Sequence, residues 1–298
     1  MPAPAKTRTP LGTWLTRWWQ SEPAVKIDVI DDFAWPKGLT PRPITLYSST
    51  RSSRGPARPL LVALDGQTMP QWELAATLDN LATGPQPIFP VVAAIPASAD
   101  RLEEYGTAGI PDFAGRGKRA RAFQDFLVSG VIPAIRARTH AGRTREGIGI
   151  FGASMGGLGA LDTAWNHPAV FGFAGIFSGS LWWRSDDSSP AARQSSRIML
   201  GRIRATTPRP DLRLWFEAGT ADEKDDRDGN GVIDAIQDTT ELIDAMVERG
   251  FRRGVDVVYR QVEGGEHNER TWAGVLPEFL RWGCAARLGG GTRLRVEC

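Results

Sequence analysis

The 298-residue sequence contains only two cysteines and three histidines. Cys284 and Cys298 cannot build a disulfide framework, and their spacing matches no metal-binding pattern. Two free thiols are the simplest interpretation, with a single bridge near the C-terminus as the alternative. No segment has 18 consecutive apolar residues, and residues 1–24 lack the apolar stretch of a secretory signal. We therefore expect a cytoplasmic protein with no membrane partner.

An excess of charge of either sign is also missing. The 36 basic and 34 acidic side chains leave a formal net charge of +2, and the arginines are scattered along the chain. Nucleic-acid-binding proteins usually concentrate basic residues on one surface, so we expect no nucleic-acid partner. The apolar share of 41% is ordinary for a globular protein with a large core.

Continuous apolar runs alternate with helix-like segments along most of the chain. Such runs suit strands that are buried on both faces, as in a mostly parallel sheet. We expect strands at 25–30, 44–47, 60–64, 88–95, 147–151, 173–177, 212–216 and 255–262. We expect helices at 119–138, 155–165, 239–249 and 269–282. The alternation predicts a single α/β domain over residues 25–298, with helices on both faces of the sheet, preceded by an arm at 1–24 that folds back through its tryptophans.

The clearest motif is Gly152-Ala153-Ser154-Met155-Gly156-Gly157, between an expected strand and an expected helix. A sharp turn from strand to helix strains the serine backbone and exposes its hydroxyl, and the glycines remove side chains that would clash. The helix N-terminus places N–H groups and positive dipole beside the reacting centre. This context predicts that Ser154 is a nucleophile rather than an ordinary serine in a glycine-rich turn.

A serine nucleophile needs a base and an acid that orients the base. Of the three histidines, only His267 follows the last expected strand, where loops surround the site of an open α/β sheet. The acid should follow the preceding strand, in the chain order serine, acid, histidine. Asp222 is our choice; Glu223 is its main alternative, and Glu217 is expected to belong to the strand.

Acyl transfer also requires donors for the developing oxyanion. The backbone N–H of Met155 follows the nucleophile and supplies one donor. The second should come from the loop after an early core strand, where Asp65-Gly66-Gln67 ends the run at 60–64. Gln67 is therefore expected to supply it, unless the segment is a plain Asp-Gly turn.

Together these residues resemble the esterase D-like branch of the α/β-hydrolases, which includes enterochelin esterases, feruloyl esterases and mycolyltransferases. The resemblance spans residues 60–282 and implies the α/β-hydrolase fold, a triad of Ser154, Asp222 and His267, and an oxyanion hole at Met155 and Gln67. The matching segments are Leu64-Asp65-Gly66-Gln67, Gly152-Ala153-Ser154-Met155-Gly156-Gly157, Ser178-Gly179-Ser180-Leu181-Trp182-Trp183, Gly219-Thr220-Ala221-Asp222-Glu223 and Gly264-Gly265-Glu266-His267-Asn268-Glu269.

Two segments are candidates for substrate contact. Trp182 and Trp183 follow the strand next to the nucleophile strand, so their loop faces the same end of the sheet. Two adjacent tryptophans cannot both easily enter the core, and we expect one of them to hold a flat group of the substrate. Arg101 lies in a segment that resembles the acyl side of enterochelin esterase-like proteins. It either contacts an acidic or catechol-bearing substrate or makes a structural ion pair.

The segment 226–234 resembles the first nine positions of an EF-hand loop. A structural Ca²⁺ would be held by side-chain oxygens and one backbone carbonyl, from Asp226, Asp228, Asn230, Val232 (carbonyl) and Asp234. Gln237 replaces the glutamate expected at position 12. The alternative is an acidic turn held by its own hydrogen bonds.

These residues predict a serine esterase that cleaves a small-molecule carboxylic ester through an acyl-enzyme, with no cofactor for catalysis. An acyltransferase of the mycolyltransferase type could use the same triad with an alcohol in place of water. A non-catalytic binding module on the same fold is a third hypothesis, which the complete set of serine, histidine and acid disfavours.

Overall fold

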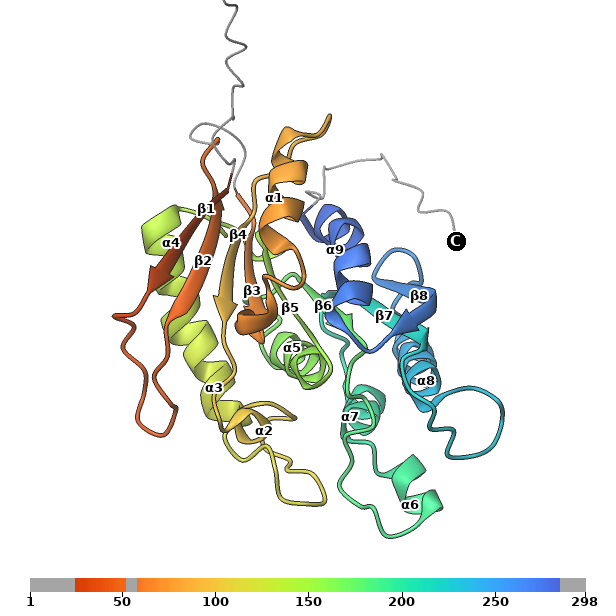
Figure 1. The fold of residues 1–298 in the computed structure, drawn as a ribbon. Coiled ribbons are helices and arrows are strands. Elements are labelled where there is room, and N and C mark those ends of the chain that lie inside the picture. The colour runs from red at the N-terminus through yellow and green to blue at the C-terminus, as the bar shows by residue number, and fades with distance from the viewer. Residues whose placement is uncertain (1–24, 52–57, 285–298) are drawn as a thin grey trace, which may run out of the picture.

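A computed structural model describes residues 25–51 and 58–284 (Figure 1). Within these ranges one sheet contains eight strands in the order β1-β2-β4-β3-β5-β6-β7-β8. Strands β1 and β2 are antiparallel additions at one edge, and the other six strands, β4-β3-β5-β6-β7-β8, run parallel to one another. The strand bounds are Val25–Ile30 (β1), Ile44–Ser49 (β2), Leu60–Leu64 (β3), Val91–Ile95 (β4), Ile148–Ala153 (β5), Phe173–Phe177 (β6), Arg213–Ala221 (β7) and Val257–Glu266 (β8).

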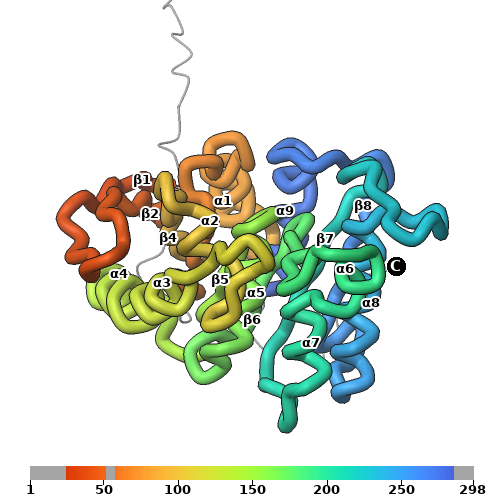
Figure 2. Tube along the Cα trace, turned by 90° about the horizontal axis from the view of Figure 1, so that it is seen from below, coloured from red at the N-terminus to blue at the C-terminus, as the bar shows by residue number. Residues whose placement is uncertain are grey.

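Helices cover both faces of this sheet, as the alternating pattern predicts. Figure 2 shows α1 and α9 on one side, and α3, α4, α5, α7 and α8 on the other. The helix bounds are Leu74–Thr83 (α1), Arg101–Glu104 (α2), Ala120–Phe126 (α3), Ile132–Thr139 (α4), Met155–Asn166 (α5), Pro190–Ser195 (α6), Ile198–Ala205 (α7), Asp234–Glu248 (α8) and Glu269–Cys284 (α9). Short turns of 3₁₀-helix lie at Gly66–Thr68 and Arg145–Gly147.

The residues of each central strand divide between two cores, because successive side chains point to opposite faces of a sheet. On β3, Leu60 and Val62 belong to the core that includes α3, α4, α5, α7 and α8, whereas Leu61 and Ala63 belong to the core that includes α1 and α9. Residues Leu60–Leu64 are all buried, which explains why the sequence shows a continuous apolar run.

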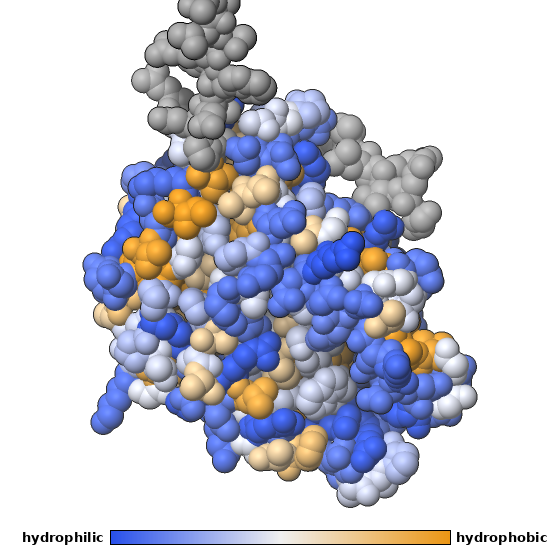
Figure 3. Space-filling model, viewed as in Figure 1, coloured by the Kyte–Doolittle hydropathy of each residue, from blue (hydrophilic) through white to orange (hydrophobic). Residues whose placement is uncertain are grey.

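Edge strand β1 differs from the central strands. Its Ile27 and Val29 are 52% and 64% exposed, and apolar side chains gather over this edge of the molecule in Figure 3.

None of the helices within residues 25–51 and 58–284 has the length and apolar character needed to cross a bilayer. The expected N-terminal arm at 1–24 and Cys298 lie outside the described residues, and Cys284 forms no disulfide within the described part of the chain.

Several element boundaries differ from the expectation. The helix expected at 119–138 is interrupted by a π-helical turn, Leu127–Val131, which joins α3 to α4. Pro133 lies in the first turn of α4, where the missing N–H of proline is tolerated. In the interior of a continuous α-helix the same proline would break the helix. Helix α8 begins at Asp234, five residues before the expected start, and β7 continues to Ala221, so that Glu217 lies within the strand.

Candidate active site

Ser154 lies on the turn between β5 and α5 with φ 56° and ψ −125°. A positive φ is strained for a residue other than glycine, and such strain persists only where the surroundings enforce it. Here the Ser154 N–H donates to the carbonyl of Phe177 at 2.9 Å, and its carbonyl accepts from the N–H of Ser180 at 3.0 Å. The turn is therefore pinned to the loop that follows β6.

The glycines around Ser154 are required by close backbone contacts. A Cβ on Gly152 would lie 2.7 Å from the carbonyl carbon of Gly156, and a Cβ on Gly156 would lie 2.7 Å from Asp65 Oδ2. Both separations are shorter than side-chain carbons tolerate, so a larger residue would push the turn apart. This confirms the physical reason for the spacing of glycines in the motif.

His267 follows β8 and contacts Asp222, which follows β7. Nδ1 of His267 lies 3.1 Å from Asp222 Oδ1, and the Asp222 side chain is only 1% exposed while that of His267 is 43% exposed. The indole of Trp272 packs edge-on against the imidazole, with ring centroids 5.3 Å apart. A buried carboxylate thus orients a histidine whose other face is open to a substrate.

Glu223, the alternative acid, has different surroundings. It lines a pocket together with Asp225 and Asp234, and burial, reinforced by these acidic neighbours and Asp222, raises the pKa of Glu223 to about 7. Of the two candidates it is Asp222 that the structure brings to His267.

Within the described residues no hydrogen bond joins Ser154 to His267. The Ser154 hydroxyl instead lies 3.4 Å from the hydroxyl of Ser180. Catalytic hydrogen bonds are often long in the absence of substrate and tighten in the complex, so this geometry is compatible with a nucleophile and its base.

The two expected oxyanion donors lie at the ends of adjacent parallel strands. Met155 is the first residue of α5, where backbone N–H groups lack a partner within the helix. Gln67 follows Gly66, which packs so closely on β4 that a Cβ there would lie 2.5 Å from the carbonyl carbon of Ala94. The side chain of Gln67 accepts a hydrogen bond from the N–H of Ala97 at 2.8 Å, which fixes the turn.

Arg101 makes an ion pair with Asp65 that uses two of its nitrogens. Its Nε and Nη2 lie 2.7 Å from Asp65 Oδ1 and Oδ2, and the N–H of Asp65 donates to the hydroxyl of Tyr105 at 3.0 Å. Because Asp65 Oδ2 also limits the space at Gly156, the pair braces the serine turn against the Gln67 loop. The structural ion pair is the alternative that the structure contains, and a substrate contact by Arg101 stays a prediction.

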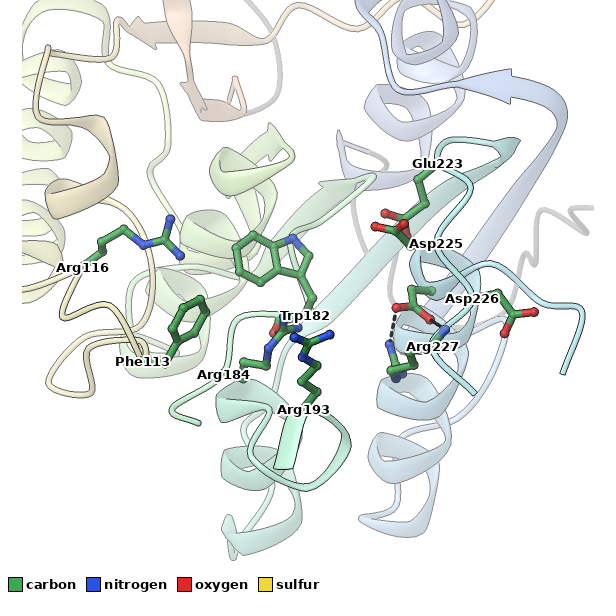
Figure 4. Close-up of a pocket in the computed structure, with 10 residues that line it drawn as sticks. Phe113, Arg116, Trp182, Arg184, Arg193, Glu223, Asp225, Asp226 and Arg227 are labelled. Atoms are coloured by element: carbon green, nitrogen blue, oxygen red, sulfur yellow. Dashed lines mark hydrogen bonds and ion pairs between the residues drawn. The ribbon is translucent and has the colours of Figure 1, made fainter. Parts of the chain in front are cut away.

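A pocket of about 520 Å³ opens between the loops after β6 and β7 (Figure 4). Phe113, Arg116 and Trp182 form one wall, and Glu223 and Asp225 belong to the opposite wall. Trp182 is partly buried and lines the pocket. Its neighbour Trp183 is fully buried. One tryptophan is thus available to a ligand and the other is part of the core.

The other two histidines lie away from this site. His140 follows α4 and lines a separate cavity of about 200 Å³ with Arg136 and Arg143. His167 ends α5, and burial lowers its pKa. Within the described residues it is His267, and neither of these two histidines, that contacts Asp222, and its role as base stays a prediction.

The acidic loop at 226–234 is held by hydrogen bonds of its own. Asp226 accepts from the N–H groups of Asn230 and Gly231, at 3.1 and 2.9 Å, and Asp234 pairs with Arg227. Among the described residues no group of three or more His, Cys, Asp or Glu side chains is placed to hold a metal ion. The arrangement matches the alternative of an acidic turn, and calcium binding stays a prediction.

Three residues that the sequence analysis did not assign to the site lie beneath the histidine. The hydroxyl of Ser178 donates to Asp222 Oδ1 at 3.0 Å and lies 3.4 Å from Glu217 Oε2. Trp272 donates its indole N–H to the same hydroxyl at 2.9 Å. Burial raises the pKa of the Tyr259 phenol, and the nearby negative charges of Glu217 and Asp222 raise it further. Ser178 begins one of the segments that resemble the esterase D-like branch, but nothing in its spacing indicated a contact with Asp222.

The comparisons with known proteins agree with this fold and these motifs. Residues 40–282 match the family model described as "Putative esterase". The chain belongs to this esterase family. The iron(III) enterobactin esterase of Escherichia coli (strain K12) is 24% identical over 239 residues, which are 78% of this chain and 51% of that protein. The chain therefore spans about half the length of the curated enterobactin esterases that it matches.

Solved structures show the same fold. The enterobactin esterase of Shigella flexneri, solved in the presence of enterobactin, aligns with a TM-score of 0.62 at 21% identity, covering 88% of this chain and 59% of that one. The fluorophosphonate-binding serine hydrolase F of Staphylococcus aureus aligns with a TM-score of 0.59 at 13% identity, covering 87% and 98%. The predicted α/β fold and the enterochelin esterase-like resemblance are confirmed.

Proposed function

We propose that this protein hydrolyses carboxylic esters through an acyl-enzyme formed on Ser154, with His267 as general base and Asp222 as the acid that orients it. The observation that carries the proposal is the combination of a strained serine at the start of α5 with a buried Asp222–His267 pair. Membership of an esterase family supports the same reaction class.

The contacts assign a role to each nitrogen of His267. Because Nδ1 faces the carboxylate of Asp222, it carries a hydrogen, and Nε2 is left with a lone pair. Nε2 accepts the proton of Ser154 as its oxygen attacks the ester carbonyl, and the carbonyl oxygen becomes an oxyanion facing the N–H groups of Met155 and Gln67. Collapse of this intermediate expels the alcohol, which takes the proton from Nε2. Water then attacks the acyl-enzyme by the same route and releases the acid.

The pocket beside this site supports an ester with a flat group. The loop carrying Trp182 begins at Ser178 and includes Ser180, whose hydroxyl lies 3.4 Å from that of Ser154. A ring stacked on the exposed part of Trp182 would thus be held by the same loop that contacts Ser154, and such stacking contributes about 0.5–1.5 kcal/mol beyond area burial. One structural relative was solved in the presence of 2,3-di-hydroxy-N-benzoyl-serine, which contains a flat benzoyl ring.

The test is hydrolysis of a panel of p-nitrophenyl, feruloyl and catecholate esters by the purified protein and by Ser154→Ala. We expect the variant to lose about 10⁴–10⁶ in kcat. The matched control is Ser188→Ala, an exposed serine on the surface, which should retain activity. A folded Ser154→Ala variant with more than about a tenth of the activity would overturn the assignment. Product analysis with an added alcohol separates hydrolysis from acyl transfer.

A further inference from the structure

Below the Asp222–His267 pair, three buried polar atoms have no hydrogen-bond partner in the described structure: Glu217 Oε1, Asp222 Oδ2 and the Tyr259 hydroxyl. Glu217 and Asp222 are 1% and 7% exposed as residues, so water does not compensate their oxygens freely. A buried carboxylate without partners is costly, because its charge has been removed from water. Each of the two carboxyl groups therefore has one oxygen that no neighbouring hydrogen of the described residues reaches.

The hydroxyl of Ser178 is the donor for which the two carboxyl groups compete. It has a single hydrogen and two lone pairs, and it stands between two carboxyl groups, at 3.0 Å from Asp222 Oδ1 and 3.4 Å from Glu217 Oε2. One lone pair accepts the indole N–H of Trp272. If both carboxyl groups were ionised, they would compete for one hydrogen, and one lone pair of the hydroxyl would face a negative oxygen.

We propose that Glu217 is a positioning residue: it holds a proton at neutral pH and donates it to Ser178 Oγ, so that Ser178 directs its own hydrogen to Asp222. The hydroxyl then uses its hydrogen and both lone pairs. Asp222 receives two hydrogen bonds on Oδ1, from Ser178 and His267, which fix the carboxylate that orients the base. The proposal rests on the proposed function for the role of Asp222, but the position of the proton does not depend on it.

The proton belongs on Glu217 rather than on Asp222. Asp222 accepts from the side chains of two different residues, His267 and Ser178, whereas the contacts of the Glu217 carboxyl are with Ser178 alone, through its backbone and its hydroxyl at the longer distance. Asp222 and the Tyr259 phenol are the titratable groups that face Glu217, with His267 on the far side of Asp222. Burial, and then the charge of Asp222, raise the pKa of Glu217 to about 8.

The same proton makes stability depend on pH in a predictable direction. Between about pH 4.5 and about pH 8 the unfolded chain has lost this proton while the folded protein keeps it, so the folded state binds more protons. The contribution of Glu217 to the free energy of unfolding therefore falls as pH rises through this window. Glu217→Gln has the same shape without the ionisation, and its melting temperature relative to the wild type should rise progressively over the same window.

Difference infrared spectroscopy detects the proton directly. At about pH 6.5 the spectrum of the wild type minus that of Glu217→Gln should contain the C=O stretch of a protonated carboxylic acid. The control is Glu263→Gln, an exposed glutamate on β8, whose difference spectrum should contain only carboxylate bands. A Glu217→Gln difference spectrum with carboxylate bands alone would overturn the proposal, as would a melting-temperature difference that does not change with pH.

Kinetics test the positioning role separately. Glu217→Leu removes the donor, and we expect kcat to fall by about tenfold or more with little change in KM, since small misplacements of catalytic groups are costly. Glu217→Gln should recover most of kcat because its amide N–H can donate to Ser178. Equal losses in the two variants would overturn the role of the donor. Failure of the proposed function would appear instead as full activity in Ser154→Ala, with the infrared result unchanged.

Discussion

Replacing Asp222 by asparagine tests how the histidine is oriented. If the amide nitrogen faces His267, it donates to Nδ1, and the histidine hydrogen moves to Nε2, which can then no longer accept a proton from Ser154. If the amide oxygen faces His267, the NH₂ group takes the buried place of Oδ2, which has no partner, at a cost of about 1–3 kcal/mol. In both orientations the charge that stabilises the imidazolium is lost. We expect kcat to fall by about 10⁴, which corresponds to about 5 kcal/mol.

The matched control is Glu223→Gln, since Glu223 is adjacent and was the alternative acid. It lines the pocket, and the carboxylate that contacts His267 in the described structure is that of Asp222, so the replacement of Glu223 should change kcat for a small p-nitrophenyl ester by less than about tenfold. Circular dichroism must show that both variants are folded. A nearly active Asp222→Asn variant together with an inactive Glu223→Gln variant would refute the orientation of His267 by Asp222.

Three further predictions concern the pocket, the base and the acidic loop. Trp182→Ala should lower kcat/KM for aryl esters several-fold more than for short aliphatic esters. Trp183→Ala should instead lower the free energy of unfolding by about 3–5 kcal/mol, because this side chain is fully buried. Equal losses of kcat/KM on both ester classes in Trp182→Ala, together with a lower melting temperature, would contradict the role of Trp182. His267→Gln should abolish ester hydrolysis while leaving the protein folded, and an active variant would contradict its role as base. If the loop at 226–234 binds Ca²⁺, a strong chelator should lower the melting temperature and added calcium should restore it; an unchanged melting temperature would contradict this and leave the loop held by its own hydrogen bonds.

Much of the fold could be predicted because the central strands are buried on both faces. Their continuous apolar runs, as at Leu60–Leu64 and Phe173–Phe177, are visible without knowledge of neighbours. The helices α1, α2, α6 and α7 were not predicted; the four to six residues of α2 and α6 are too few to show a period. The π-helical turn at Leu127–Val131 was missed because its periodicity is close to that of the flanking helices.

The site residues also divide into those that a local sequence pattern predicts and those that depend on tertiary packing. Ser154 and His267 could be assigned because each stands in a local pattern that chemistry requires, a strained glycine-flanked turn and a loop after the last strand. The choice between Asp222 and Glu223 depended on which way two adjacent side chains turn at the end of β7, and no local pattern contains that information. The contact of Ser178 with Glu217 joins residues 39 apart in the sequence and depends on the packing of β6 beside β7.

The central claim is that Ser154 is an activated nucleophile. The most direct measurement is intact-protein mass spectrometry after treatment with a fluorophosphonate probe, followed by peptide mapping. We expect one adduct per chain, located on Ser154, no labelling of Ser154→Ala, and strongly slowed labelling of His267→Gln. Absence of labelling in the folded wild type, or an adduct located on another serine such as Ser180, would contradict the claim.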